Sequence, residues 1–224
     1  MITKFKNIHE GKRCFIIGTG PSLNKTNLGL LKNEICFGVN TLYRGLESFG
    51  INPQYWAIGD DTIIQKHSRN ILQNIETTLF SCSPGGNRLK KKDGDKCKEV
   101  YNMPLLGHMT SNDAFSSDVS KGTFNGRTVI IDVCLQVAYY MGFSKVYLVG
   151  CDSDYSGIHR FDGLTSDVPN TPAIQGDFSF IFNAYEICKK NYESNGREII
   201  NCTVGGKLET FKRQNLEDVA TNKT

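Results

Sequence analysis

The apolar run at residues 14–17 ends abruptly at a turn of small residues, Gly18-Thr19-Gly20-Pro21-Ser22. Short, continuous apolar runs are typical of strands in parallel sheets, because helices cover both faces of such sheets. The two glycines let the backbone approach a ligand closely, since neither carries a Cβ atom. Pro21 and Ser22 are typical of a helix start, where free N–H groups and the helix dipole attract phosphate. The turn therefore predicts a phosphate-bearing ligand, and a tight turn that binds nothing is the alternative.

Strand-like and helix-like segments alternate along the sequence. The apolar runs predict strands at residues 14–17, 35–39, 55–58, 78–82, 145–149 and 198–202, and helices at residues 28–31, 62–75, 128–141 and 178–192. Residues 85–125 are rich in Gly, Lys, Asp, Asn and Ser, which predicts an irregular, excursive region. This alternation predicts an α/β fold, a Rossmann-like and mainly parallel sheet with helices on both faces. The length of 224 residues fits a single domain over residues 1–224, with a lid-like loop region at residues 153–177.

Composition and charge argue against several classes of function. The net charge of +3 is too small to predict a nucleic-acid partner. The one basic stretch, residues 88–98, is interrupted by Asp93 and Asp95, so it is typical of a solvated turn and only weakly of a surface for anions. Eight cysteines without a C-x-x-C pair predict reduced thiols in the cytoplasm rather than disulfides or zinc. We expect neither a signal peptide nor a transmembrane segment, since no apolar stretch is long enough.

Polar residues follow nearly every predicted strand. In α/β folds ligands bind beyond the carboxyl ends of the strands. Those positions hold Gly18 to Ser22, Asn40, Asp60 with Asp61, Ser83, Asp152 and Thr203. The Asn40 amide can donate to and accept from a base or sugar, or it can occupy a left-handed turn. Asp60 and Asp61 can orient sugar hydroxyls, or one of them can cap the next helix. Together these positions predict a ligand site at one edge of the sheet.

Five residues are candidates for the chemistry itself. Asp152 and Asp154 form a D-x-D triplet whose oxygens suit Mg²⁺ or Mn²⁺ on a diphosphate, although such triplets also occur by chance in turns. His159 lies seven residues beyond Asp152 and is the best placed of the four histidines for acid–base work. Arg127 opens the buried helix, where its guanidinium suits a phosphate or carboxylate, or else a surface ion pair. The Tyr155 hydroxyl could reach the same anion.

These positions, taken in order, resemble two related families. The segments FIIGTGPSL, CFGVN, KVYLVGCD and SGIHRFD, with a strand ending at Asp60 and a helix from Arg127, resemble the bacterial sialyltransferases of glycosyltransferase family 42. They also resemble a wider group of 6-hydroxymethylpterin diphosphokinase-like proteins, which includes glycosyltransferases for surface polysaccharides and flagellin. The glycine turn alone is unspecific, whereas its combination with the arginine and YLVGCD is more specific.

The resemblance implies a GT-A-like α/β domain with a lid over a CMP-sugar and no required cofactor or metal. It implies contacts with the nucleotide and its phosphate from Gly18, Gly20, Pro21, Ser22 and Asn40, and it places Asp60 in the donor site. Thr19 and Asp152, at the same strand ends, are further candidates for binding the nucleotide. Arg127 falls on a functionally important arginine of the family, Tyr155 lies one position from a phosphate-binding tyrosine, and His159 takes the place of a second one. The general-base histidine of the family is missing near residues 172–180, so the resemblance leaves that role to His159 or Asp177.

The sequence thus predicts an inverting glycosyltransferase that moves sialic acid or a related sugar from a nucleotide donor such as a CMP-sugar. The expected acceptor is a surface glycan or a lipid-linked precursor. One alternative is a pterin diphosphokinase with Mg²⁺ on Asp152 and Asp154, and another is a non-catalytic nucleotide-binding protein. A cytoplasmic location is expected, and peripheral contact with the inner membrane surface and formation of a homo-oligomer are left open.

Overall fold

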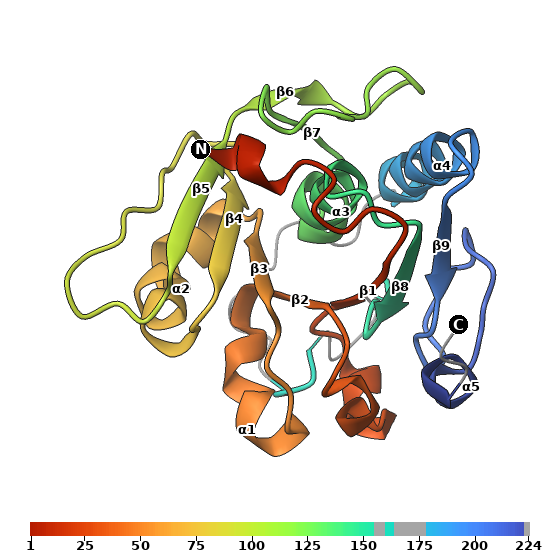
Figure 1. Ribbon diagram of the computed structural model, residues 1–224, viewed down its shortest axis with the longest axis horizontal. Helices are drawn as coiled ribbons and strands as arrows, with labels where there is room; N and C mark the ends of the chain where they lie inside the picture. The colour runs from red at the N-terminus through yellow and green to blue at the C-terminus, as the bar shows by residue number, and fades with distance from the viewer. Residues whose placement is uncertain (155–159, 164–177, 222–224) are drawn as a thin grey trace.

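A computed structural model of the protein describes residues 1–154, 160–163 and 178–221. Its centre is a seven-stranded sheet in the order β5-β4-β3-β2-β1-β8-β9, in which every neighbouring pair is parallel (Figure 1). The strands are β1 (Arg13–Ile17), β2 (Cys36–Val39), β3 (Tyr55–Ile58), β4 (Thr78–Cys82), β5 (Glu99–Met103), β8 (Lys145–Val149) and β9 (Glu198–Asn201). The predicted Rossmann-like parallel sheet is confirmed.

Helices cover both faces of this sheet, as expected (Figure 1). One face packs against η1 (Ile2–Phe5), η5 (Ile130–Leu135), α3 (Gln136–Tyr140) and α4 (Ser179–Glu193). The other packs against η2 (Pro21–Lys25), η3 (Leu28–Leu31), η4 (Asn40–Gly45), α1 (Leu46–Phe49), α2 (Asp61–Asn74) and α5 (Leu216–Thr221). Side chains alternate along β1, so that Cys14 and Ile16 enter the first core while Phe15 and Ile17 enter the second. Burial on both faces explains why this strand is apolar throughout.

The prediction of an irregular region over residues 85–125 is wrong for three segments. β5 forms an edge of the main sheet, and β6 (Leu105–His108) pairs in parallel with β7 (Thr123–Asn125) in a separate two-stranded sheet. Four of the five residues of β5 are only half-buried, because an edge strand has one neighbour. Its sequence EVYNM therefore lacks the apolar run that revealed the inner strands. Helix α5 was also missed, and the predicted helix at 128–141 begins with a π-helical turn, η5.

The strand order reverses between β1 and β8, and the glycine turn after β1 lies against the end of β8. A Cβ atom on Gly18 would overlap the carbonyl oxygen of Gly150, and one on Gly20 would overlap the Asp152 carboxylate. These glycines therefore permit a close approach of the chain to itself, and their contact with a ligand stays a prediction. The ends of the two strands are brought together at the point where α/β folds bind ligands.

Replacing Gly18 with alanine should lower the free energy of unfolding by about 1–3 kcal/mol, because the backbone carbonyl of Gly150 cannot move aside without disturbing β8. Urea denaturation of the wild type and the variant measures this difference. Gly29→Ala is the matched control, since a Cβ there would meet only the Asn27 side-chain oxygen, at 3.2 Å. Equal effects of the two substitutions would show that the Gly18 contact does not constrain the turn.

Candidate functional site

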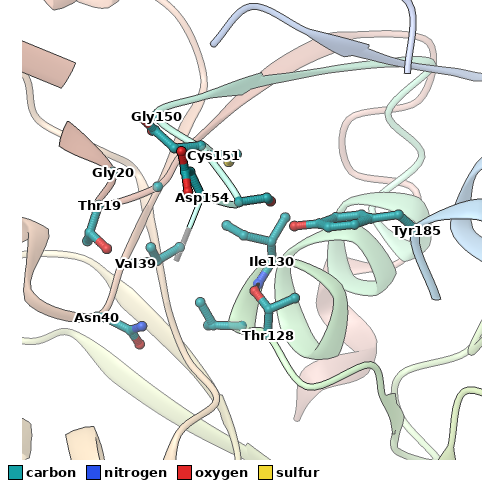
Figure 2. A pocket seen from close by; sticks show the side chains of 14 residues that line it. Thr19, Gly20, Val39, Asn40, Thr128, Ile130, Gly150, Cys151, Asp154 and Tyr185 are labelled. Atoms are coloured by element: carbon teal, nitrogen blue, oxygen red, sulfur yellow. Dashed lines mark hydrogen bonds between the residues drawn. The ribbon is translucent and has the colours of Figure 1, made fainter. Parts of the chain in front are cut away.

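A cleft lies at the carboxyl ends of β1, β2 and β8, where the strand order reverses (Figure 2). Its volume is about 140 Å³, which is below the roughly 300–1,000 Å³ of pockets that enclose a whole small-molecule ligand. The cleft therefore matches one part of a nucleotide, such as a phosphate with its ribose. The described residues that line it are Gly18, Thr19, Gly20, Val39, Asn40, Thr128, Val129, Ile130, Gly150, Cys151, Asp152, Ser153, Asp154 and Tyr185.

Five residues predicted to bind the nucleotide meet in this lining: Gly18, Thr19, Gly20, Asn40 and Asp152. No sequence motif marks the opposite wall, which comes from the turn before η5, from Ile130 and from Tyr185 of α4 (Figure 2). Tyr185 is only 2% exposed, so in the sequence it is indistinguishable from a core residue of an amphipathic helix.

Asp152 is fixed by the start of η2. The backbone N–H of Ser22 donates to Asp152 Oδ1 at 3.1 Å, and the Ser22 hydroxyl donates to Asp152 Oδ2 at 2.7 Å. Pro21 opens this short helix as expected. The carboxylate thus occupies the place at the helix start that the sequence had suggested for a phosphate, and both Ser22 donors are used within the chain. A ligand would reach Ser22 only by displacing Asp152.

Asn40 lies at the end of β2 with a left-handed backbone, at φ 47°, which asparagine tolerates better than most residues. Its carbonyl oxygen accepts a hydrogen bond of 3.1 Å from Nε1 of the fully buried Trp56. Its side chain lies in the cleft wall below Val39 (Figure 2), and the buried Oδ1 atom has no hydrogen-bond partner among the described residues. An unpaired buried acceptor calls for an explanation, and a bound ligand or water next to it is one. The structure thus gives Asn40 the left-handed turn, and its contact with a ligand stays a prediction.

Asp60 and Asp61 have structural partners outside the cleft lining. Asp60 caps α2, its Oδ1 accepting from the N–H groups of Thr62 at 2.7 Å and Ile63 at 3.1 Å. The structure thus gives Asp60 the capping role, and its contact with a donor sugar stays a prediction.

Asp61 holds the loop after β4. It accepts hydrogen bonds from the Ser83 hydroxyl, from the Gly85 N–H at 2.7 Å and from the Asn87 amide at 2.7 Å. Burial acts to raise the pKa of Asp61, but these hydrogen bonds together lower it. Asp61 is therefore an ionised anchor of the loop.

The two carboxylates of the D-x-D triplet also have partners within the chain. Asp152 is held by Ser22, and Asp154 Oδ1 lies 3.0 Å from the Lys207 ammonium. Across residues 1–154, 160–163 and 178–221, no group of three or more His, Cys, Asp or Glu side chains is arranged to hold a metal ion. This donor set does not fit an open two-carboxylate site for Mg²⁺, and the metal alternative stays a prediction.

Arg127 lies in the turn before η5 rather than in the helix. Its backbone is left-handed, at φ 67°, and its N–H donates to Asn125 Oδ1 at 2.7 Å. The exposed guanidinium stacks on Phe180 of α4, 4.6 Å from the ring centroid. Arg127 is not among the lining residues of the cleft, although it adjoins Thr128, which is. Its catalytic role stays a prediction.

A buried acid that the sequence analysis missed supports this turn. Asp132 is 1% exposed, and its Oδ1 accepts a hydrogen bond of 2.6 Å from the Gly126 N–H. Burial raises the pKa of Asp132 from 3.8 to about 8, even though backbone N–H groups of residues 126–128 oppose that shift. Asp132 belongs to the π-helical turn, a distortion that often marks functional sites. Because its carboxylate holds the Gly126 N–H, Asp132 positions the turn that carries Thr128 and Val129.

Residues 160–163 are fastened to the rim of the cleft. The Phe161 N–H donates to the Thr19 carbonyl oxygen at 2.9 Å, and the Arg160 guanidinium donates to the Thr41 hydroxyl. Asp162 Oδ2 lies 3.0 Å from both the Arg160 and Arg44 guanidinium groups.

The predicted catalytic residues Tyr155, His159 and Asp177 lie outside the described residues, as does most of the predicted lid at 153–177. Within the described part of the chain, none of the helices has the length and apolar character needed to cross a membrane.

Comparison with solved structures shows a fold shared with a glycosyltransferase. The chain aligns with the structure of MAf glycosyltransferase from Magnetospirillum magneticum AMB-1 with a TM-score of 0.56 and 12% sequence identity. The alignment covers 100% of this chain and 38% of that one, so this chain spans well under half of the neighbour's length. No curated protein matches the sequence.

A protein-family model matches residues 1–157, a range that includes strands β1 to β8 and the cleft lining from Gly18 to Asp154. The model describes 6-hydroxymethylpterin diphosphokinase MptE-like proteins. This is one of the two families that the glycine turn, the strand ends and YLVGCD resemble. The chain belongs to the 6-hydroxymethylpterin diphosphokinase MptE-like family.

Proposed function

We propose that the protein is a glycosyltransferase that takes a sugar, sialic acid or a relative, from a nucleotide-activated donor such as a CMP-sugar. One observation carries the proposal: the ends of β1, β2 and β8 form a single cleft at the reversal of strand order, with the Asn40 amide in its wall. The volume of the cleft suits the phosphate and ribose of a donor. The fold shared with a glycosyltransferase is consistent with this assignment.

In the proposed reaction the acceptor hydroxyl attacks the sugar carbon that bears the phosphate, and the configuration at that carbon is inverted. His159 or Asp177 takes the proton of the attacking hydroxyl. Arg127, Tyr155 and His159 are the candidates for stabilising the negative charge that develops on the departing phosphate. Donors held in place for that charge lower the barrier because they act in the transition state rather than on the bound substrate.

Thermal unfolding in the presence of CMP, CDP, UDP, GDP or ATP tests the nucleotide assignment. We expect CMP to stabilise the protein most, because it is the nucleotide of the proposed donor. A ligand that binds only the folded state adds about 2.7 kcal/mol to the free energy of unfolding when its concentration is about 100 times its Kd. Asn40→Ala should weaken CMP binding about tenfold, which corresponds to one lost hydrogen bond of about 1.4 kcal/mol. Asn74→Ala is the control, because Asn74 is an exposed residue of α2 outside the cleft. Equal CMP affinities for Asn40→Ala and Asn74→Ala would remove Asn40 from the site.

A second candidate is a diphosphokinase, an activity that the name of the matching family favours. This function requires Mg²⁺ with ATP, whereas the proposed glycosyl transfer requires no metal. Activity that EDTA abolishes and Mg²⁺ restores, together with stabilisation by ATP and Mg²⁺ rather than CMP, would replace the first proposal with the second. A protein that binds nucleotides without catalysis would show no donor hydrolysis above background.

A further inference from the structure

The loop that leads from β4 to β5 concentrates the positive charge of the protein. Its residues 88–98, here called the basic loop, run along the outer side of the edge strand β5 (Figure 1). Six cations and two carboxylates give this loop a net charge of +4, whereas the whole chain carries +3. The rest of the chain is therefore slightly acidic, at −1. The cations are Arg88, Lys90, Lys91, Lys92, Lys96 and Lys98, and all are exposed.

The cations of the basic loop are not neutralised by neighbours. Asp95 is buried, and its carboxylate pairs with the Arg69 guanidinium of α2 at 2.8 Å. Asp95 therefore offsets the charge of Arg69 rather than that of a cation in the loop. Of the six cations, only Lys96 has a carboxylate within 4 Å among the described residues, Glu76 at 3.8 Å. The surface thus presents five positive groups with no acidic partner in the described part of the chain.

The backbone of the basic loop is held in place by hydrogen bonds. The Asn102 side chain of β5 accepts from the Leu89 N–H at 2.8 Å and donates to the Leu89 carbonyl at 2.9 Å. The Cys97 N–H donates to the Leu72 carbonyl of α2 at 3.0 Å. A partner therefore meets a preformed surface, and the entropy cost of ordering the loop backbone is already met by folding.

We propose that the basic loop docks the protein onto an anionic lipid bilayer. Clusters of four to eight Lys and Arg residues recognise acidic lipid headgroups, each cation adding about 1 kcal/mol near the surface. Leu89 and Cys97, the apolar residues of the loop, are buried, so the contact is electrostatic and does not insert into the bilayer. A flat bilayer can contact the cations of one protruding loop without contacts elsewhere on the protein. Nucleic acid would also need cations on the rest of the molecule, whose net charge is negative.

Docking through this loop would bring the β5 side of the molecule to the membrane (Figure 1). Arg88 lines a polar cavity of about 300 Å³ at the carboxyl ends of β4 and β5, whereas the Lys98 N–H donates to the Thr77 carbonyl oxygen at their amino ends. The basic loop therefore spans both ends of the edge strand. The docking surface itself does not depend on the reaction.

Co-sedimentation with vesicles tests the proposal. Wild-type protein should bind phosphatidylcholine vesicles that contain about 30% phosphatidylglycerol and not pure phosphatidylcholine, and about 0.5 M salt should release it. Replacing Lys90, Lys91 and Lys92 together by Gln should weaken binding to the anionic vesicles by at least about tenfold. A matched triple variant with the exposed residues Lys12, Lys32 and Lys145 changed to Gln loses the same charge outside the basic loop and should keep most of the binding.

Four results would overturn docking by the basic loop. They are equal losses in the two triple variants, equal binding to neutral and anionic vesicles, tighter loop-dependent binding to an RNA duplex than to vesicles, and self-association of the loop variant with unchanged vesicle binding. The last would mean that the lysines only protect the β5 edge from pairing. The loop variant should retain the CMP-induced thermal shift of the wild type. Failure to dock would therefore leave the nucleotide assignment standing, and failure to bind CMP would leave docking standing.

Discussion

Replacement of His159 by alanine is expected to lower the turnover of the proposed transfer by at least about 100-fold, while nucleotide affinity changes by less than about threefold. A positioned acid or base contributes about 10²- to 10⁴-fold, and it acts on a proton that moves only during the reaction. Nucleotide affinity depends instead on the cleft. Turnover is measured as the rate of sugar transfer in a single-turnover experiment, and nucleotide affinity as the CMP concentration at half-saturation.

Two residues that follow His159 in the sequence have contacts at or near the cleft. The Phe161 N–H donates to the carbonyl oxygen of Thr19, a lining residue, and the Arg160 guanidinium donates to the Thr41 hydroxyl. His108→Ala is the control, since His108 is exposed and does not line the cleft. Parallel losses of turnover and affinity in His159→Ala would indicate a binding role in place of the catalytic one.

Replacement of Asp132 by leucine should lower the free energy of unfolding by about 3 kcal/mol. The substitution leaves the buried Gly126 N–H without its acceptor, a loss of about 1–3 kcal/mol, and leucine must also fit a fully packed position. CMP binding should weaken as well, since the turn that Asp132 positions carries Thr128 and Val129 into the cleft wall. Asp132→Asn retains an acceptor oxygen of the same shape and should keep both properties near the wild-type level.

The pH dependence of stability tests whether the folded protein keeps the proton on Asp132. The folded protein holds a proton on Asp132 up to about pH 8, whereas the unfolded chain releases it near pH 4. Since the folded state binds the extra proton, stability falls as pH rises between these values, by at most about 1.4 kcal/mol per pH unit. Urea denaturation at pH 5 to 8 should show a shallower slope for Asp132→Asn than for the wild type. Identical slopes would mean that Asp132 does not retain its proton.

The sequence predicts the inner strands and the edge strand β9, and it misses the other edge strand, β5. β3, β4 and β8 lie where apolar runs were found, because burial on both faces demands such runs. β5 has a single neighbour and half-buried residues, so its composition matches that of the surrounding loops. The apolar helix at 128–141 is predicted, but no residue pattern indicates the π-helical turn at its start, which contains Asp132.

The structure has a cleft at the strand ends that the sequence indicates, and the contacts of its residues come only from the three-dimensional structure. The Ser22–Asp152 pair joins residues 130 positions apart, so no local pattern announces it. The glycines after β1 serve contact with β8, which the motif could not distinguish from contact with a ligand. Asp132 lay in an apolar helix and was passed over, because a lone acid there has no partner visible in the sequence.

The indole of Trp56 is an intrinsic fluorescent probe of the cleft. It is the only tryptophan in the chain, it is shielded from water, and it donates to the main chain of Asn40 in the cleft wall. Any ligand that shifts Asn40 changes the local field at that single fluorophore. Emission from the unlabelled protein can therefore follow occupancy of the cleft in real time, including by stopped-flow mixing.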